Sequence, residues 1–188
     1  CIPTKHYMAD ISKQIAQIRK MVDEGAYFTI NRARQYGKTT TLAALEKALK
    51  EDYLVIWLDF QAIGSASYEN ENTFSLAFLE LFFRELKRVH ADKHREMKEC
   101  MAEIQKMRKE QIQGFDLMEL FGQLLEVCRV SEKPVVLMID EVDSASNNQV
   151  FLDFLAQLRN YYLERDTKGV VTFQSVILTG VYDIKNLK

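Results

Sequence analysis

The chain has 188 residues, of which 47% are apolar and 28% charged, as expected for one globular domain with a sizeable core. The formal net charge of −2 argues against a protein that binds nucleic acid or anionic membranes through bulk positive charge. The three cysteines, Cys1, Cys100 and Cys128, are widely spaced, which argues against a disulfide framework and favours a reducing, cytoplasmic compartment. No apolar stretch has the length of a membrane span, so we expect no membrane partner.

The first third of the chain predicts a helix, a strand, a second helix and a second strand. Residues 10–24 repeat apolar side chains at helical spacing, and residues 26–30 form a short aromatic and β-branched run typical of a buried strand. Residues 39–51 again have helical spacing, and residues 53–60 are almost continuously apolar, as in a strand covered on both faces. The apolar residues assigned to the two helices are Ile11, Ile15, Ile18, Val22, Leu42, Leu45 and Leu49.

The middle of the chain predicts a polar turn over residues 61–72, an apolar helix from Thr73 to about His90, and a charged segment over residues 91–113. Phenylalanines at helical spacing in the apolar helix indicate core packing. The mixed charges of residues 91–113 favour a solvated helical arm. His90 and His94, with Cys100 nearby, invite a metal site, but their charged surroundings favour a solvated helix face. The phenylalanines are Phe74, Phe78, Phe82 and Phe83.

The last part of the chain predicts a helix over residues 117–130, capped by Asp116, and a strand over residues 134–143. A further helix over residues 147–166 and a buried strand over residues 175–181 follow. Buried strands that alternate with helices predict an α/β fold with a mainly parallel sheet and helices on both faces. We expect residues 1–188 to form a single domain.

The segment "NRARQYGKTTTL", residues 31–42, contains half of the phosphate-loop pattern G-x-x-x-x-G-K-[ST]. Gly37, Lys38 and Thr39 fit its end. A strand before the loop and a helix after it would bring backbone N–H groups and a helix N-terminus to one anion site. Gly37 would let the backbone approach phosphate closely, Lys38 would reach the β- and γ-phosphates, and the Thr39 hydroxyl would bind Mg²⁺.

The start of this loop departs from the pattern, because Arg32 stands where the first glycine is expected. The turn that contacts phosphate lies nearer Gly37, so the loss of the first glycine need not abolish binding. Arg32 and Arg34 would place positive charge beside a phosphate site. The alternative, that both arginines are surface residues unrelated to nucleotide, stays open.

A second acidic motif lies at the end of the strand predicted over residues 134–143. Asp140 would lie at the carboxyl end of that strand, where ligands bind in open α/β sheets, and could hold Mg²⁺ through water opposite Thr39. Glu141 could polarise an attacking water as a general base. Asp143 is more consistent with a turn or a helix cap. The alternative is an acidic turn after a core strand, but the order of the two motifs favours two halves of one nucleotide site.

The last predicted strand ends in Thr179 and Gly180. In additional-strand NTPases a polar side chain at this position contacts the γ-phosphate or positions water, and Thr179 is placed to do so. The alternative is a threonine that merely closes the strand before a glycine turn.

The stretches "RARQYGKTTTL", "VVLMIDEVD" and "VILTG" together resemble the AAA-ATPase-like family of bacterial P-loop NTPases, which is related to archaeal-type and STAND-like ATPases. Many relatives carry the loop R-P-R-x-[FY]-G-K-[ST]. This chain departs from that loop at Ala33, which replaces the proline. The segment that leads into the loop, residues 5–30, is also similar to the family. The loop matches at Arg32, Arg34, Tyr36, Gly37, Lys38 and Thr39.

The resemblance implies ATP and Mg²⁺ as ligands, with Thr40 beside Thr39 in the nucleotide site, and an additional-strand sheet of five strands. The phosphate-loop strand should then lie beside the Thr179 strand. Many relatives carry a nuclease-like PD-(D/E)XK domain farther along the chain, and nucleic acid would be reached only through it. We expect the sequence to end, at Lys188, before the fifth strand, the lid and any arginine finger.

These features predict a domain that binds ATP and hydrolyses it with Mg²⁺, coupled to a conformational change in a larger protein. A nucleotide-dependent switch or scaffold with little hydrolysis, regulating a downstream nuclease-like domain, is the main alternative. A small-molecule kinase is disfavoured because the Asp140–Glu141 pair suits water activation. The choice of ATP over GTP rests mainly on the resemblance, and oligomerisation stays open.

Overall fold

The computed structural model describes residues 12–31, 38–110 and 112–180. Within these ranges the strands are β1 (Tyr27–Asn31), β2 (Leu54–Asp59), β3 (Val135–Asp140) and β4 (Ser175–Gly180). The helices are α1 (Ser12–Asp23), α2 (Lys38–Leu49), α3 (Glu71–Arg88), α4 (Arg95–Glu110), α5 (Leu117–Val130) and α6 (Gln149–Lys168). Short 3₁₀ turns are η1 (Phe60–Ala62), η2 (Ser65–Tyr68) and η3 (Val142–Ser144).

The four described strands form one sheet in the order β1-β4-β3-β2, and every neighbouring pair is parallel. β4, the last in sequence, lies between β1 and β3, so the strand after the phosphate loop is not the neighbour of β1. This order is the additional-strand arrangement, and it confirms the predicted α/β fold class and the predicted position of the Thr179 strand beside β1.

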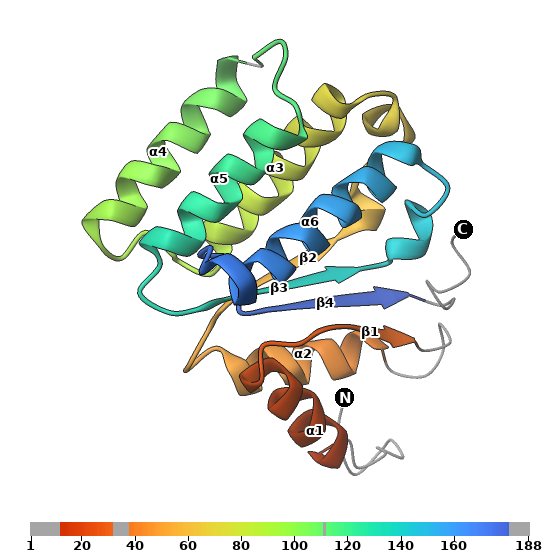
Figure 1. Ribbon diagram of the computed structural model, residues 1–188, viewed down its shortest axis with the longest axis vertical. Coiled ribbons are helices and arrows are strands. Elements are labelled where there is room, and N and C mark those ends of the chain that lie inside the picture. Colours follow the sequence, from red (N-terminus) through yellow and green to blue (C-terminus); the bar gives the residue numbers. More distant parts are fainter. Residues whose placement is uncertain (1–11, 32–37, 111, 181–188) are drawn as a thin grey trace.

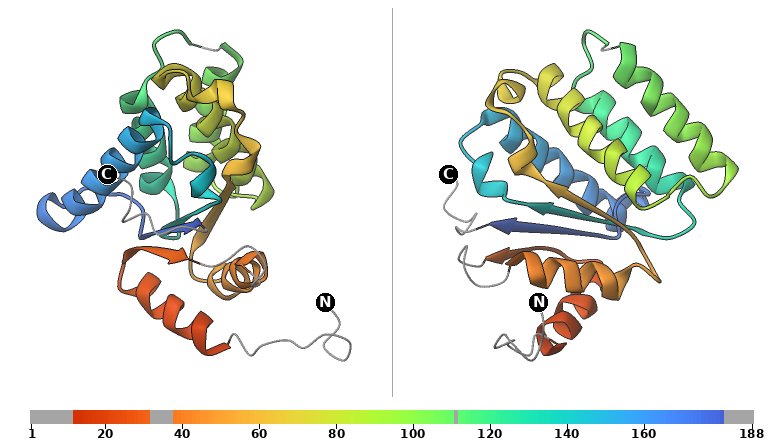
Figure 2. Two further views of the ribbon diagram at one scale, coloured as in Figure 1. Left: turned by 90° about the vertical axis from the view of Figure 1, so that its right-hand side faces the viewer. Right: turned by 180° about the vertical axis from the view of Figure 1, so that it is seen from behind.

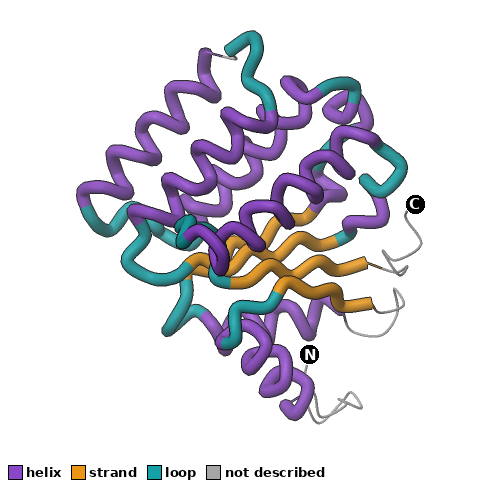
Figure 3. Tube along the Cα trace, viewed as in Figure 1, coloured by secondary structure: helices purple, strands orange, loops and turns teal. Residues whose placement is uncertain are grey.

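Helices cover both faces of the sheet, which makes three layers (Figure 1). α1 and α2 pack on one face, and α3, α4, α5 and α6 lie on the other, as the turned views and the trace coloured by secondary structure also show (Figures 2 and 3). Each face has its own apolar cluster, the larger one under α3–α6 and the smaller one under α1 and α2. All six residues of β3 and of β4 are buried, as their continuous apolar sequence predicts.

The alternation of side chains along the strands assigns each residue to one of these layers. In β3, Leu137 and Ile139 belong to the larger cluster, whereas Val136 and Met138 belong to the cluster under α1 and α2. In β4, Ile177 also lies on the α2 face. The same period of two therefore carries the ends of both strands onto the face that α2 covers.

The charged segment 91–113 differs from the solvated arm that its composition predicts. Its helix, α4, packs against α3 and α5, and Ile104 is fully buried. The prediction was wrong because four apolar residues recur at helical spacing among the charges, and one buried stripe is enough to dock an amphipathic helix. They are Met97, Cys100, Met101 and Ile104.

Other sequence predictions were met more closely. Three of the four predicted core phenylalanines, Phe74, Phe78 and Phe82, are fully buried, and Phe83 is 3% exposed. Asp116 caps α5 by accepting a hydrogen bond from the backbone N–H of Glu119 at 3.0 Å. β1 is less buried than predicted, because in the described sheet it pairs only with β4. No helix among the described residues is long and apolar enough to cross a membrane.

Candidate functional site

The carboxyl ends of all four described strands meet at one edge of the sheet, and α2 begins beside them (Figure 1). In register, Asp59 of β2 pairs with Asp140 of β3, and Asn31 of β1 pairs with Gly180 of β4. The first residue of α2 is Lys38. Polar residues from separate parts of the chain, including the predicted Asp140, therefore converge where ligands bind in open α/β sheets.

Asp140 and Thr179 lie together on the α2 face of this edge. Asp140 is 6% exposed and Thr179 is fully buried, and the Thr179 hydroxyl donates a hydrogen bond to Asp140 Oδ1. The same oxygen accepts a hydrogen bond from the backbone N–H of Glu141 at 2.8 Å. Two donors on one oxygen fix the orientation of this buried carboxylate.

Glu141 marks the point at which the chain leaves the sheet. Its backbone is left-handed, with φ 57° and ψ 39°, a conformation that costs about 1–2 kcal/mol for a residue other than glycine. The backbone N–H and the hydroxyl of Ser144 both donate to the Glu141 carbonyl, at 3.1 and 2.8 Å, and hold the turn. The half-buried Glu141 thus follows Asp140 on a tightly bonded turn rather than on an extended strand.

Two residues at this edge were not expected to belong to the site. Asp143, interpreted from sequence as a turn or cap residue, lies in η3 with its carboxylate directly over Gly180: a Cβ added at Gly180 would come within 2.6 Å of Asp143 Oδ1. Asp59 ends β2 just as Asp140 ends β3, and it accepts a hydrogen bond from the backbone N–H of Gln61 at 2.9 Å. The signal for Asp59 was present, because it too is an acid that closes a buried apolar strand.

The phosphate-loop residues Arg32, Arg34 and Gly37 lie outside the described residues. Lys38 and Thr39 are described only as the first backbone positions of α2. Thr40, also predicted to contact the cofactor, is exposed in the first turn of the same helix. The flanking elements agree with the prediction: β1 ends at Asn31, α2 begins at Lys38, and both points lie at the carboxyl ends of the strands (Figure 1).

The donor set fits a hard cation better than a soft one. Carboxylate oxygens are ligands that Mg²⁺ accepts, usually one or two of them together with water and substrate phosphates. Asp140 supplies such a carboxylate, oriented by Thr179 and Glu141. Among the described residues no group of three or more His, Cys, Asp or Glu side chains is arranged to hold a metal by itself.

Known proteins agree with this architecture. The chain matches the ORC2 protein of Aeropyrum pernix, solved in ADPNP–ADP complexes, with 14% sequence identity and a TM-score of 0.52. The match covers 96% of this chain and 44% of that one, so this chain spans less than half of that protein's length. At this identity the likeness establishes the fold alone. No curated protein matches the sequence.

The family is shown by a match of the sequence itself. The model of the AAA-like domain family matches residues 3–181, which contain every strand and helix described above. This range also includes the phosphate-loop segment and both acidic strand ends. The chain therefore belongs to the AAA-like domain family.

Proposed function

We propose that this domain binds ATP with Mg²⁺ at the carboxyl edge of its sheet and hydrolyses it. The observation that carries the proposal is the Asp140–Thr179 pair, which lies on the α2 face at the edge where α2 begins. A phosphate bound at the start of α2 would receive backbone N–H groups and the positive end of the helix dipole. Membership of the AAA-like family supports the same assignment.

Each residue has a distinct part in binding. Lys38 would contact the β- and γ-phosphates, and Arg32 and Arg34 would add positive charge beside them. The hydroxyl of Thr39 and the carboxylate of Asp140 would hold Mg²⁺, and Thr40 would line the start of α2. The metal would neutralise charge on the phosphate oxygens. Because the Thr179 hydroxyl donates to Asp140, we assign Thr179 first to holding that carboxylate, and its contact with the γ-phosphate is the further role expected of it.

Hydrolysis needs a base for the attacking water, and Glu141 is the proposed base. The water would attack the γ-phosphorus while the bond to the β–γ bridging oxygen breaks, its proton would pass to Glu141, and ADP and phosphate would leave. The tight turn after Asp140 fixes the backbone of Glu141 relative to the carboxylate that would hold the metal. A positioned base contributes about 10²- to 10⁴-fold to rate.

A nucleotide-dependent switch with little hydrolysis is the second candidate. The Thr179–Asp140 hydrogen bond favours it, because the hydroxyl has a single proton and would have to leave Asp140 before it could donate to a phosphate oxygen. In either case the domain would act within a larger protein, for which the nuclease-like domain of similar family members is the candidate partner. Contact with nucleic acid would then belong to that partner.

Phosphate release from Mg²⁺–ATP, measured beside ATP binding, tests hydrolysis. Glu141→Gln should bind ATP like the wild type while turnover falls at least about a hundredfold. Glu103→Gln, at an exposed position of α4, is the matched control and should leave both unchanged. Binding without measurable turnover in the wild type would support the switch, and unchanged turnover in Glu141→Gln would remove Glu141 from the role of base.

A further inference from the structure

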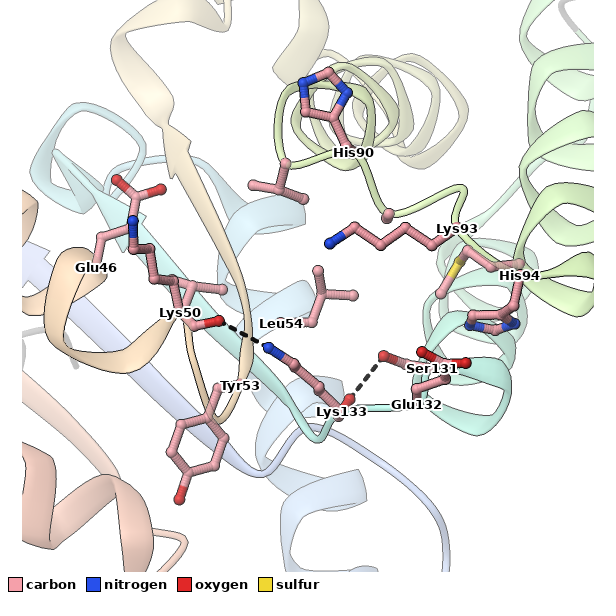
Figure 4. Close-up of a pocket in the computed structure, with 14 residues that line it drawn as sticks. Glu46, Lys50, Tyr53, Leu54, His90, Lys93, His94, Ser131, Glu132 and Lys133 are labelled. Carbon is pink, nitrogen blue, oxygen red and sulfur yellow. Dashed lines mark hydrogen bonds between the residues drawn. The ribbon is translucent and has the colours of Figure 1, made fainter.

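A pocket lies at the opposite end of the sheet, where the strands begin. Its volume is about 170 Å³, and it lies between the end of α2, the start of β2, the turn between α3 and α4, and the segment before β3 (Figure 4). Leu54, the first residue of β2, lines it together with Met97 of α4. Because Asp140 ends β3 and this pocket lies before its start, the pocket is separate from the candidate ATP site.

Three lysines surround the apolar floor of the pocket, which Leu54 and Met97 form. Lys50, Lys93 and Lys133 all line the pocket, and the Lys93 side chain extends into its middle (Figure 4). Lys133 Nζ donates to the carbonyls of Lys50 and Glu51, at 3.1 and 2.6 Å, which holds it at the rim. Within the described part of the chain, the ammonium groups of Lys50 and Lys93 have neither an ion-pair nor a hydrogen-bond partner.

The acidic residues of the pocket offset this charge only in part. Glu46 is already paired with Arg88, which also binds Glu85 at 2.6 Å. Glu132 is exposed at the rim. His94 also lines the pocket, and its Nδ1 lies 3.3 Å from Glu96 Oε2. Two unpartnered ammonium groups beside an apolar floor are suited to a ligand that carries one negative group and one apolar body.

The turn that carries Lys93 is fixed by its own backbone. His90 has a left-handed φ of 52°, and the N–H of Ala91 donates to the carbonyl of Leu86 at 3.0 Å. The N–H of Lys93 donates to the carbonyl of Ala91 at 2.9 Å. The backbone of this wall is therefore ordered before any ligand binds, which lowers the entropic cost of binding.

From this arrangement we infer that the pocket is a binding site for a small organic anion, with a carboxylate or phosphate group on an apolar body of about one ring. The size follows from the volume, which is close to that of a cavity of roughly 150 Å³ known to hold benzene. The anionic group would bind Lys93, with Lys133 at the rim, and the apolar body would lie on Leu54 and Met97.

Amide chemical shifts of the ¹⁵N-labelled protein, titrated without nucleotide, test this inference apart from the ATP site. The probes are benzoate, phenyl phosphate and the neutral benzamide. Either anion, or both, should give saturable shifts in residues 90–94 and at Lys133, with a dissociation constant of about millimolar, as expected for so small a ligand. The anion that binds more tightly identifies the headgroup. No saturable shift with either anion, or equal binding of benzamide, would overturn the inference.

A pair of lysine variants separates the site from general surface charge. Lys93→Gln should weaken anion binding about fivefold or more, because it removes one charge-assisted contact. Lys109→Gln, exposed near the end of α4, is the matched control and should bind like the wild type. Both positions are exposed, so neither variant should unfold, and the amide spectrum reports this directly. Unchanged affinity in Lys93→Gln, or shifts at the pocket with a polyglutamate peptide alone, would contradict the assignment.

Discussion

At the scale of single residues, the Asp143 carboxylate leaves no free space for a side chain at Gly180. A methyl group at Gly180 would meet Asp143 Oδ1 at 2.6 Å and other atoms of that carboxylate at 3.0 Å. Real Cβ contacts are not that short, so the Asp143 side chain, η3 or the end of β4 would have to move. Because β4 also carries Thr179, a movement of β4 would disturb the carboxylate of Asp140.

The variant Gly180→Ala should therefore lower the free energy of unfolding by about 1–3 kcal/mol, in the range of overpacked positions, and weaken ATP binding. Gly122→Ala is the matched control. Gly122 lies within α5 with nothing within 4 Å of an added Cβ, so alanine should stabilise the helix by about 0.5–1 kcal/mol. Urea denaturation of the two variants gives both values. A Gly180→Ala protein as stable as the wild type would show that the edge is less tightly packed than described.

The sequence predicted some of the residues at this edge and missed others for a physical reason. Asp140 and Thr179 were predicted because each closes a buried strand, a position that periodicity reveals. Their mutual hydrogen bond could not be predicted, since it depends on β3 and β4 being neighbours with matched register. The contact of Asp143 with Gly180 was missed for a related reason, because the left-handed Glu141 redirects the chain after Asp140.

At the scale of elements, α4 shows how composition can mislead. Its charges dominate any average over residues 91–113, yet Ile104 is fully buried and Met97 is 1% exposed. The apolar residues of α4 do recur at helical spacing, but the stripe that they form is narrow and interrupted by lysines and glutamates. α4 is therefore part of the core layer that includes α3 and α5, and disrupting its packing should destabilise the whole fold.

Ile104→Ala tests this role of α4 and should lower the free energy of unfolding by about 2–4 kcal/mol, as for other buried isoleucines. Ile112→Ala is the control with identical chemistry, because Ile112 lies just beyond the helix and is 37% exposed. It should change stability by less than about 1 kcal/mol. Equal effects of the two substitutions would mean that α4 is a solvated arm after all.

At the scale of the whole molecule, the layered fold buries several tyrosines whose ionisation should link stability to alkaline pH. Burial raises the pKa of Tyr27 and of Tyr68 to about 12. Burial and a hydrogen bond to Asp23 raise the pKa of Tyr53 to about 12 as well. The native state therefore holds these protons more tightly than the unfolded chain, in which a tyrosine has a pKa of about 10.

A raised pKa stabilises the fold fully below about pH 10, and this contribution is lost as the pH rises towards about 12. The urea midpoint should consequently fall between about pH 9 and about pH 11. Tyr68→Phe should reduce that fall. It should cost little near pH 9, because the buried Tyr68 hydroxyl has no hydrogen-bond partner among the described residues. An identical alkaline fall in wild type and variant would contradict the assignment to Tyr68.

The fold class could be predicted from local sequence patterns, whereas the strand order could not. The alternation of strands and helices predicted an α/β fold with a parallel sheet, and the structure confirms it. The strand order was not encoded in any local pattern, and the expectation that β4 lies beside β1 came from the family resemblance. The same order places the ends of β1 and β3 on either side of the end of β4, which is why motifs far apart in the sequence share one edge.

The central claim, an ATP site at this edge, is tested most directly by calorimetric titration of the protein with ATP and Mg²⁺. We predict that the wild type binds and that Lys38→Ala loses at least about tenfold in affinity, the size expected for a lost charge-assisted contact. Lys47→Ala, an exposed lysine in the last turn of the same helix, should bind like the wild type. Equal affinity of Lys38→Ala and the wild type, or no binding by the wild type, would contradict the account.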